Sequence, residues 1–154
     1  NVAVEVINLL NKLKITNIKE SIIKKSLKKI NWYGRVEFRG KVLFDCAHNP
    51  SAVKVLIDYI KTLKYNKLIL VFGVLEDKDY KTMLKMLLPL TYKVILTKPN
   101  SYRALDPRLL AKEVDKYFLI IEDNNKALKY AKSIAGKKDL ILVTGSIYVV
   151  GDLI

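Results

Sequence analysis

Histidine and cysteine are almost absent from this chain of 154 residues, which holds one of each, His48 and Cys46. A single cysteine excludes an internal disulfide and suits a reducing compartment, so we expect a cytoplasmic protein. Without a C-x-x-C pair or a second histidine, we expect no structural zinc site and assign no metal ligand. No apolar run reaches the roughly 18–20 residues of a membrane span, and no signal-peptide pattern opens the chain, so we expect no membrane partner.

Glycine-rich phosphate loops are also missing. Neither G-x-x-x-x-G-K-[ST] nor G-x-G-x-x-G occurs, so any ATP bound here would need its phosphates held by other elements. The net charge of +13 favours anionic partners. Aromatic and basic residues do not interleave as in RNA-binding modules, so we expect no nucleic-acid partner. The many lysines could attract a small polyanion, or they could simply lie on solvated helix faces.

The first 30 residues read as two helices. The first has an apolar stripe from Val2 to Leu13, and the second has one from Ile22 to Ile30. Asn17 with Glu20 resembles a capping box before the second helix. The chain opens inside or at the edge of a helix without a cap, which suggests a piece of a longer protein. We expect a boundary after residue 32.

From residue 33 to 154 the pattern alternates between strand and helix. "YGRVEFRGKVLFDCA" reads as two strands around a tight turn at Arg39-Gly40, and "KLILVFG" and "DLILVTGS" read as fully buried strands. Further strands are "YKVILTKP" and "YFLIIED", with helices between them, one of which is marked by Leu109, Leu110, Val114 and Tyr117. "YVVGDLI" reads as a short helix or an edge strand. This alternation predicts an α/β fold, a Rossmann-like, mostly parallel sheet with helices on both faces.

Polar residues collect where these strands end. In an open parallel sheet, ligands bind beyond the carboxyl ends of the strands. We therefore expect residues 45–49, 73–79, 97–103, 122–123 and 144–146 to converge on one edge of the sheet.

The stretch "LFDCAHNPSA" is the most informative of these strand exits. Asn49 is a good N-cap and Pro50 suits the first helical position, so a helix N-terminus should point to this edge and attract anions. Asp45 and His48 precede it, and imidazole can exchange a proton near pH 7. The structural alternatives are a satisfied loop histidine and a turn carboxylate. Cys46 reads as packing.

Four further residues are candidates for anion binding. Arg35, on the strand that pairs with the one before Asp45, could hold a phosphate through two parallel hydrogen bonds. Lys78, Arg103 and the Ser146 hydroxyl could bind a carboxylate. Each has a structural alternative: exposed charge for the three cations, and a strand-to-turn cap for Ser146.

Together these stretches resemble a known family. "WYGRVE", "LFDCAHNPSA", "VFGVLEDKD", "ILTKPNSYRALDP" and "LVTGSIYVVGDLI", in this order, are similar to the C-terminal domain of folylpolyglutamate synthase/dihydrofolate synthase in the Mur ligase superfamily. Residues 1–32 resemble the helical tail of that family's central ATPase domain, and residues 33–154 its C-terminal glutamate-ligase domain.

The resemblance implies an ATP- and Mg²⁺-dependent amide ligase of folate biosynthesis and one-carbon metabolism. ATP would phosphorylate a carboxylate of dihydropteroate or folate, and the amine of L-glutamate would then displace phosphate. The resemblance places the phosphate loop and the magnesium ligands in a central domain on which this chain would dock. This chain would bind glutamate and close the nucleotide site, and alone it would be inactive.

The resemblance also assigns roles residue by residue. It implies that Asp45 contacts the ribose, Arg35 the ATP phosphates and Asn1 the adenine. His48 would be catalytic, near the incoming glutamate and the acyl phosphate. Substrate-binding roles would fall to Ser146 on the glutamate side, to Arg103 for a glutamate carboxylate, and to Lys78.

Two positions depart from the family pattern. Tyr33 replaces the usual proline before Gly-Arg, which should loosen the turn that presents Arg35. Cys46 replaces a glycine, and it would be strained if that position needs a positive φ.

Two other readings stay open. One is the C-terminal domain of a Mur-type cell-wall peptide ligase. The other is a non-catalytic module that binds a nucleotide or an acidic ligand.

Overall fold

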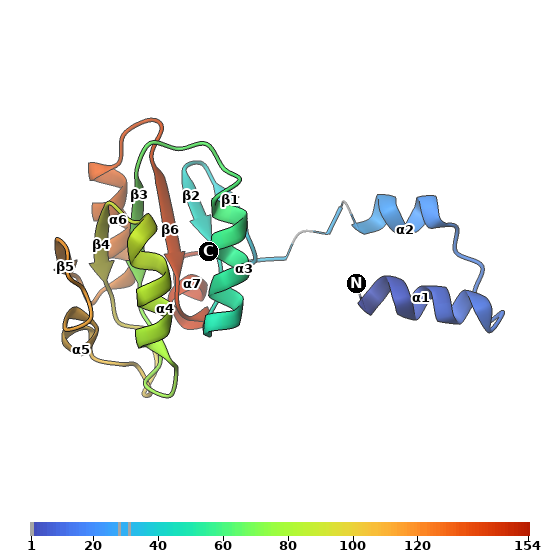
Figure 1. Cartoon of the computed structure of the whole chain (residues 1–154), viewed down its shortest axis with the longest axis horizontal. Helices are drawn as coiled ribbons and strands as arrows, with labels where there is room; N and C mark the ends of the chain where they lie inside the picture. Colours follow the sequence, from blue (N-terminus) through green and yellow to red (C-terminus); the bar gives the residue numbers. More distant parts are fainter. Residues whose placement is uncertain (1, 28, 31) are drawn as a thin grey trace. The chain divides into compact units, whose positions relative to one another are not determined.

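The computed structural model describes residues 2–27, 29–30 and 32–154 (Figure 1). It divides into two compact units, Asn1–Trp32 and Tyr33–Ile154. The predicted adenine contact of Asn1 lies outside the described residues. Across these residues, no helix has both the length and the apolar character needed to cross a bilayer.

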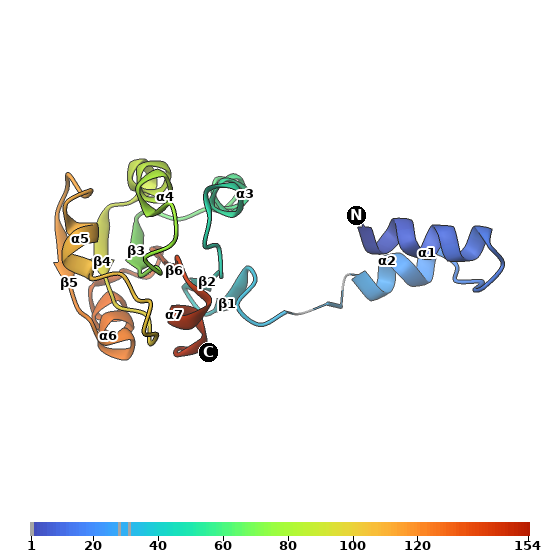
Figure 2. The same cartoon turned by 90° about the horizontal axis from the view of Figure 1, so that it is seen from below.

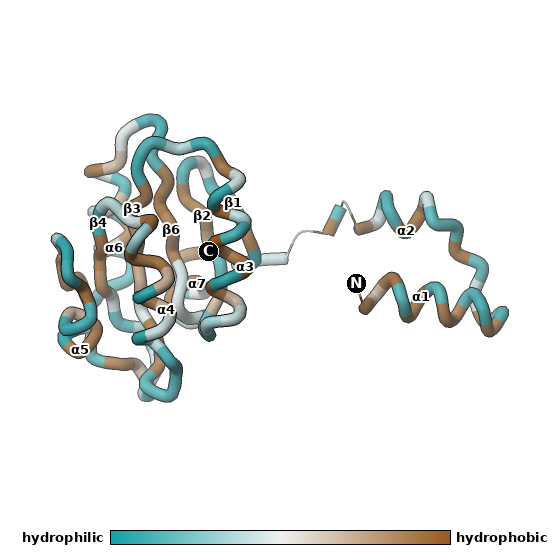
Figure 3. Tube along the Cα trace, in the orientation of Figure 1, coloured by the Kyte–Doolittle hydropathy of each residue, from teal (hydrophilic) through white to brown (hydrophobic). Residues whose placement is uncertain are grey.

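The first unit contains two helices, α1 (Val2–Lys12) and α2 (Glu20–Leu27), as predicted. The predicted capping box is wrong, because α2 begins at Glu20, whose carboxylate pairs with Lys24 at 2.7 Å. The segment between α1 and α2 is instead held by Asn11, whose side chain hydrogen-bonds to both the amide (2.9 Å) and the carbonyl (2.8 Å) of Ile18. Figure 3 shows apolar turns along both helices, and within these two helices only Ile23 is buried.

The second unit is built on a six-stranded sheet with the order β1-β2-β6-β3-β4-β5. β1 and β2 form an antiparallel hairpin through Gly40, which has a φ of 63°, and the remaining pairs are parallel. The predicted fold class is therefore confirmed. The strands are β1 (Glu37–Arg39), β2 (Val42–Phe44), β3 (Leu68–Phe72), β4 (Lys93–Leu96), β5 (Phe118–Ile120) and β6 (Leu140–Thr144).

Helices cover both faces of this sheet. Figure 2 shows α3 and α4 on one side and α6 and α7 on the other. The helical segments are α3 (Pro50–Ile60), α4 (Tyr80–Leu87), the short 3₁₀ helix η1 (Leu88–Leu90), α5 (Pro107–Ala111), α6 (Asn124–Ile134) and α7 (Ile147–Gly151). The segment "YVVGDLI" thus contributes a helix and not an edge strand.

Two apolar layers hold the helices to the sheet. Leu70 and Phe72 of β3 pack toward α3 and α4, whereas Ile69 and Val71 pack toward α6 and α7. All five residues of β3 and of β6 are buried, as expected for strands covered on both faces. Each fully buried aliphatic or aromatic side chain contributes roughly 1.5–3 kcal/mol to folding.

The helix predicted around Leu109 to Tyr117 is shorter than expected. α5 ends at Ala111, and Leu109 and Tyr117 are 41% and 61% exposed. Tyr117 instead precedes β5, where its ring accepts the Lys93 ammonium at 4.6 Å. The apolar spacing was helical, but only Leu110 and Val114 of that set reach the core.

Gly145, directly after β6, has no room for a side chain. Its φ is +105°, and a Cβ would lie 2.5 Å from the Gly73 carbonyl oxygen and 2.8 Å from Phe72 Cε2. We predict that Gly145→Ala lowers the free energy of unfolding by about 2 kcal/mol or more in urea titrations. Gly151→Ala is the matched control, since nothing lies within 4 Å of its Cβ position. Equal stability of the two variants would contradict this reading.

Cys46 is a buried thiol with a raised pKa. It is 4% exposed, and burial raises its pKa above the ordinary 9.0, with the Asp45 and Glu37 carboxylates adding and Arg35 opposing. Above pH 9.0 the unfolded chain loses this proton before the folded chain does. The stability that the protonated thiol contributes is therefore present below that pH and is lost as pH rises toward the folded pKa.

We predict that Cys46→Ala flattens the alkaline limb of the stability profile. The free energy of unfolding, measured by urea titration from neutral pH to about two units above the thiol's ordinary pKa of 9.0, should fall less steeply in the variant than in the wild type. Lysine and tyrosine titrations are common to both proteins and cancel in the difference. Parallel alkaline limbs would show that the thiol has the same pKa in both states.

Candidate functional site

The exits of β2, β6 and β3 lie side by side at the carboxyl edge of the sheet. Asp45 donates its amide to the Val143 carbonyl at 3.0 Å, and Gly145 donates to the Ala47 carbonyl at 3.1 Å. On the other side of β6, Gly73 donates to the Thr144 carbonyl at 3.4 Å. The backbone pairing thus continues past the strands and brings the loop at 45–48 against residues 144–146.

His48 stands between this pairing and the start of α3. The Asn49 side chain accepts from the Ala52 amide at 2.8 Å and Pro50 is the first helical residue, as predicted. His48 Nδ1 lies 3.0 Å from the Cys46 carbonyl oxygen. Because a carbonyl only accepts, this contact requires the proton on Nδ1 and leaves Nε2 of a neutral ring as a proton acceptor.

A cavity of about 230 Å³ gathers four of the predicted residues. His48 comes from the loop after β2, Lys78 from the loop after β3, Arg103 from the segment after β4 and Ser146 from the exit of β6. The remaining lining residues are Leu75, Gly145, Ile147 and Tyr148. Loops that are distant in sequence therefore meet in one concave site that carries an imidazole, two cations and a hydroxyl.

Ser146 has a structural role as well as a place in this cavity. It is 2% exposed, and its Oγ accepts from the Tyr148 amide at 3.1 Å, which caps α7. The cap predicted as the structural alternative is present. Since a hydroxyl accepts and donates at once, the Ser146 hydrogen is still available to a ligand oxygen.

Asp77 holds the two cations of the cavity together. Its carboxylate lies 2.6 Å from Lys78 Nζ and 3.8 Å from Arg103 Nη1. The hydrogen bond from Lys78 lowers the pKa of Asp77, and the charges of Lys78 and Arg103 lower it further, so the carboxylate is ionised at neutral pH. The site is thus a cluster of two cations with one internal counter-charge.

Backbone pairing fixes Arg103 in this place. Glu76 donates its amide to the Arg103 carbonyl at 3.0 Å, and Leu105 donates to the Val74 carbonyl at 3.0 Å. Within the described part of the chain, Arg103 Nε is the one buried side-chain nitrogen or oxygen without a hydrogen-bond partner. An unpaired buried donor costs about 1–3 kcal/mol, which a ligand carboxylate or phosphate oxygen could recover.

Asp45 and Arg35 lie outside the cavity, on the side toward β1. Asp45 is 7% exposed, and its two carboxylate oxygens accept from the Ala47 amide (2.8 Å) and the Val36 amide (3.0 Å). Arg35 is exposed in the turn that leads into β1. Each Asp45 oxygen keeps a lone pair that a ligand could use. The nucleotide contacts of Asp45 and Arg35 stay predictions.

The two departures from the family pattern have different outcomes. Cys46 is not strained, because among the described residues the only non-glycine residues with positive φ are Lys14 (58°) and Val36 (49°). Tyr33 is 71% exposed, but the turn it enters is held by the Asp45 carboxylate through the Val36 amide. The strained position is therefore in the turn around Arg35, which the sequence did not indicate.

A second, larger cavity of about 930 Å³ opens beyond β4 and β5. Its polar groups are mostly committed to the fold: Asp123 caps α6, and Asn124 bridges Thr97 Oγ1 (2.7 Å) and Asp152 Oδ2 (2.6 Å). Tyr148 lines both cavities and was missed from the sequence. Its place two residues after Ser146, at a strand exit, was the available signal.

Across residues 2–27, 29–30 and 32–154, no group of three His, Cys, Asp or Glu side chains could hold a metal ion.

The chain is similar to two groups of ligases. It is 31% identical over 150 residues to the dihydrofolate synthase/folylpolyglutamate synthase of Bacillus subtilis, covering 94% of this chain and 35% of that protein. It is 34% identical over 115 residues to the UDP-N-acetylmuramoyl-L-alanyl-D-glutamate–2,6-diaminopimelate ligase of Fusobacterium nucleatum, covering 68% of this chain and 24% of that enzyme.

A solved structure agrees with the first group. Escherichia coli FolC, in complex with DHPP and ADP, matches with a TM-score of 0.84 at 25% identity, covering 90% of this chain and 34% of that one. The chain thus spans about a third of the length of its folate-ligase relatives. The family model described as "Mur ligase, glutamate ligase domain" matches residues 34–147, and this chain belongs to that family.

Proposed function

We propose that this chain is the C-terminal part of an ATP-dependent ligase that joins L-glutamate to dihydropteroate or to the γ-carboxylate of folate. The observation that carries the proposal is the 230 Å³ cavity in which His48, Lys78, Arg103 and Ser146 meet. The similarity to folate ligases supports the choice of substrate. The chain's share of about a third of its relatives supports a longer parent protein that supplies the rest of the active site.

Glutamate recognition rests on the charges of the cavity. Arg103 Nε is a buried donor without a partner, and Lys78 adds a second positive charge beside it. A carboxylate of glutamate would accept from Arg103 Nε, and the Ser146 hydroxyl would donate to the same ligand. Charge-assisted hydrogen bonds of this kind contribute about 1.5–3 kcal/mol each.

His48 is suited to move the proton in amide formation. When bound, ATP supplies the phosphoryl group that activates the acceptor carboxylate as an acyl phosphate. The glutamate nitrogen then bonds to the acyl carbon, phosphate leaves, and the nitrogen loses a proton. Nε2 of His48 is the acceptor that we assign to this proton, because Nδ1 is held by the Cys46 carbonyl at 3.0 Å.

Nucleotide contacts would come from the loop beside the cavity. We assign Arg35 to the ATP phosphates and Asp45 to the ribose, as the family resemblance implies, and the similar Escherichia coli FolC was solved in complex with ADP. The sequence has no phosphate loop and the described residues hold no carboxylate cluster for Mg²⁺, so both would be bound by the preceding part of the parent protein.

The helical unit fits a domain that continues before it. Val2, Leu9 and Ile22, on α1 and α2, are 80%, 56% and 52% exposed. Apolar helix faces of this kind are normally covered in a folded protein. We propose that the helical unit, residues 1–32, is the tail of the parent's central ATPase domain, which buries these faces, and that residues 33–154 dock on that domain.

A second candidate is a Mur-type peptide ligase of cell-wall synthesis. The 34% identity to the Fusobacterium nucleatum enzyme favours it, and the same cavity could bind another acidic amino acid. Assay of the parent protein with ATP, L-glutamate and either dihydropteroate, tetrahydrofolate or a UDP-muramoyl peptide would separate the two. Turnover with the muramoyl substrate alone would overturn the folate assignment.

We predict that His48→Ala lowers kcat for glutamate ligation by roughly 10²–10⁴-fold in the parent protein, with little change in thermal stability. The reason is loss of the Nε2 acceptor, whereas the Cys46 carbonyl bond of Nδ1 is a minor contact of a half-buried ring. Phosphate release and the unfolding temperature would be measured on the same samples. A kcat that falls only in proportion to lost folded protein would make His48 a structural residue.

We predict that Arg103→Ala raises KM for L-glutamate about 10–100-fold, since it removes the buried cationic donor of the cavity. Arg108→Ala is the matched control. Arg108 is exposed, pairs with Asp106 (3.3 Å) and Glu122 (3.1 Å), and does not line the cavity. Equal KM values for the two variants would remove Arg103 from the glutamate site.

A further inference from the structure

Arg35 lies in a turn with a left-handed residue on each side. Gly34 has a φ of 66° and Val36 a φ of 49°. Glycine enters this region freely, but a β-branched valine does so rarely and only when surrounding contacts enforce it. Something must therefore hold Val36, and with it the backbone that carries Arg35.

Two carboxylates accept hydrogen bonds from the backbone of this turn. Asp45 Oδ2 accepts from the Val36 amide at 3.0 Å, and Glu37 Oε2 accepts from the Gly34 amide at 2.8 Å. Gly34 is also pinned by its carbonyl, which accepts from the Cys46 amide at 2.8 Å, and a Cβ on Gly34 would lie 2.8 Å from Cys46 Sγ. Only the Asp45 contact acts on the residue that is strained.

Asp45 itself is anchored in the sheet. Its amide donates to the Val143 carbonyl of β6 at 3.0 Å, its Oδ1 accepts from the Ala47 amide at 2.8 Å, and it is 7% exposed. The carboxylate thus links the rigid exit of β2 to the turn nine residues earlier. Each of its two oxygens has one of its two lone-pair sites filled by a backbone amide.

We infer that Asp45 is a positioning residue for Arg35: its carboxylate keeps Val36 left-handed, so that the Arg35 guanidinium is presented to the phosphate groups of the nucleotide. The inference rests on the proposed function for the identity of that anion. It is an alternative to the ribose contact that is assigned to Asp45 above, because here the effect of Asp45 on the nucleotide passes through the backbone of the turn. Strain at Val36 is then the feature that makes the carboxylate necessary.

The test uses Asp45→Ala with and without Val36→Gly. Alanine removes both oxygens that accept from the Val36 and Ala47 amides. Glycine at position 36 takes a positive φ without a carboxylate to hold it. We expect Asp45→Ala to raise KM for ATP about tenfold or more in the parent protein, and the double variant to recover most of that loss. A double variant no better than Asp45→Ala would overturn the inference and favour a direct contact between Asp45 and the nucleotide.

A control and a second readout separate this inference from the proposed function. Glu37→Gln changes the other carboxylate of the turn and should have a smaller effect, since Gly34 needs no help to be left-handed. In the 154-residue chain, hydrogen exchange at the Val36 amide should speed up in Asp45→Ala, and unchanged exchange would overturn the inference that Asp45 holds the turn. An unchanged KM for ATP in Arg35→Ala would overturn the nucleotide role of Arg35, while faster Val36 exchange would still establish that Asp45 holds the turn.

Discussion

The candidate site depends on the parallel pairing of β6 between β2 and β3. In this register Phe44 is opposite Val143 and Phe72 is opposite Thr144, so three strands end at one level. Hydrogen bonds then continue past the strand ends, from Asp45, Gly73 and Gly145. Such close approach leaves no space for a Cβ at Gly73 or Gly145. The backbone pairing that continues past the strand ends therefore also brings the loop of His48 against Ser146.

The two cations of the cavity are only partly neutralised by Asp77. Asp77 neutralises part of the charge of Lys78 and Arg103, yet these side chains are 29–43% exposed. Ion pairs at such exposure are screened and contribute about 0–1 kcal/mol. These weak pairs leave one net positive charge among Asp77, Lys78 and Arg103. In the part of the chain that the structure describes, Arg103 Nε is also buried without a hydrogen-bond partner.

Sequence patterns predicted the sheet, the α3 N-cap and the convergence of strand exits, because all three follow from local periodicity and cap chemistry. They failed where a side chain acts across the fold. The hydrogen bond from the Val36 amide to the Asp45 carboxylate joins residues nine apart, and no sequence periodicity predicts it. α5 ends at Ala111, and Tyr117 lies beyond it with its ring against Lys93 of a neighbouring strand. The capping box failed because Asn11, and not Asn17, bonds the linker.

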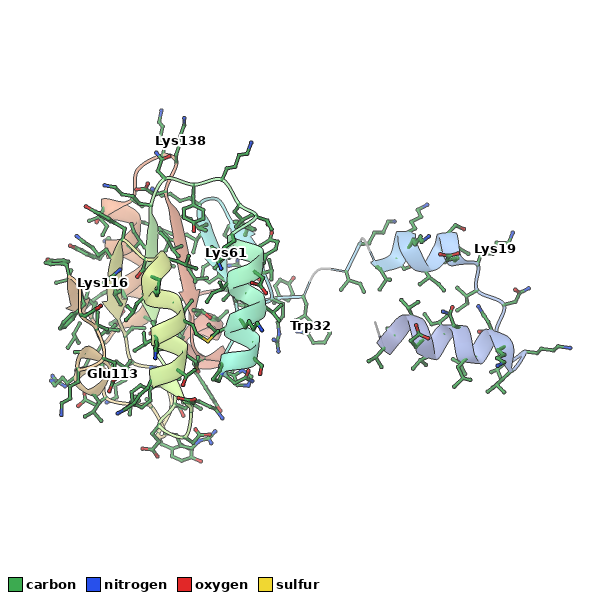
Figure 4. The ribbon with its side chains drawn as sticks, in the orientation of Figure 1. Lys19, Trp32, Lys61, Glu113, Lys116 and Lys138 are labelled. Carbon is green, nitrogen blue, oxygen red and sulfur yellow. The ribbon has the colours of Figure 1, made fainter. Side chains whose placement is uncertain are left out.

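Excess positive charge is mostly a property of the scaffold and not of the site. Lys24, Lys85 and Lys132 lie in the last turns of their helices, where cations offset the helix dipole. Lys116 donates to the carbonyls of Leu88 and Thr91, and Lys138 lies in the loop between α6 and β6 (Figure 4). Over tens of ångströms such charges are screened at physiological salt. Recognition of a small anion would therefore depend on groups within contact distance, which in the cavity are Lys78 and Arg103, and the net charge of +13 does not by itself identify a ligand.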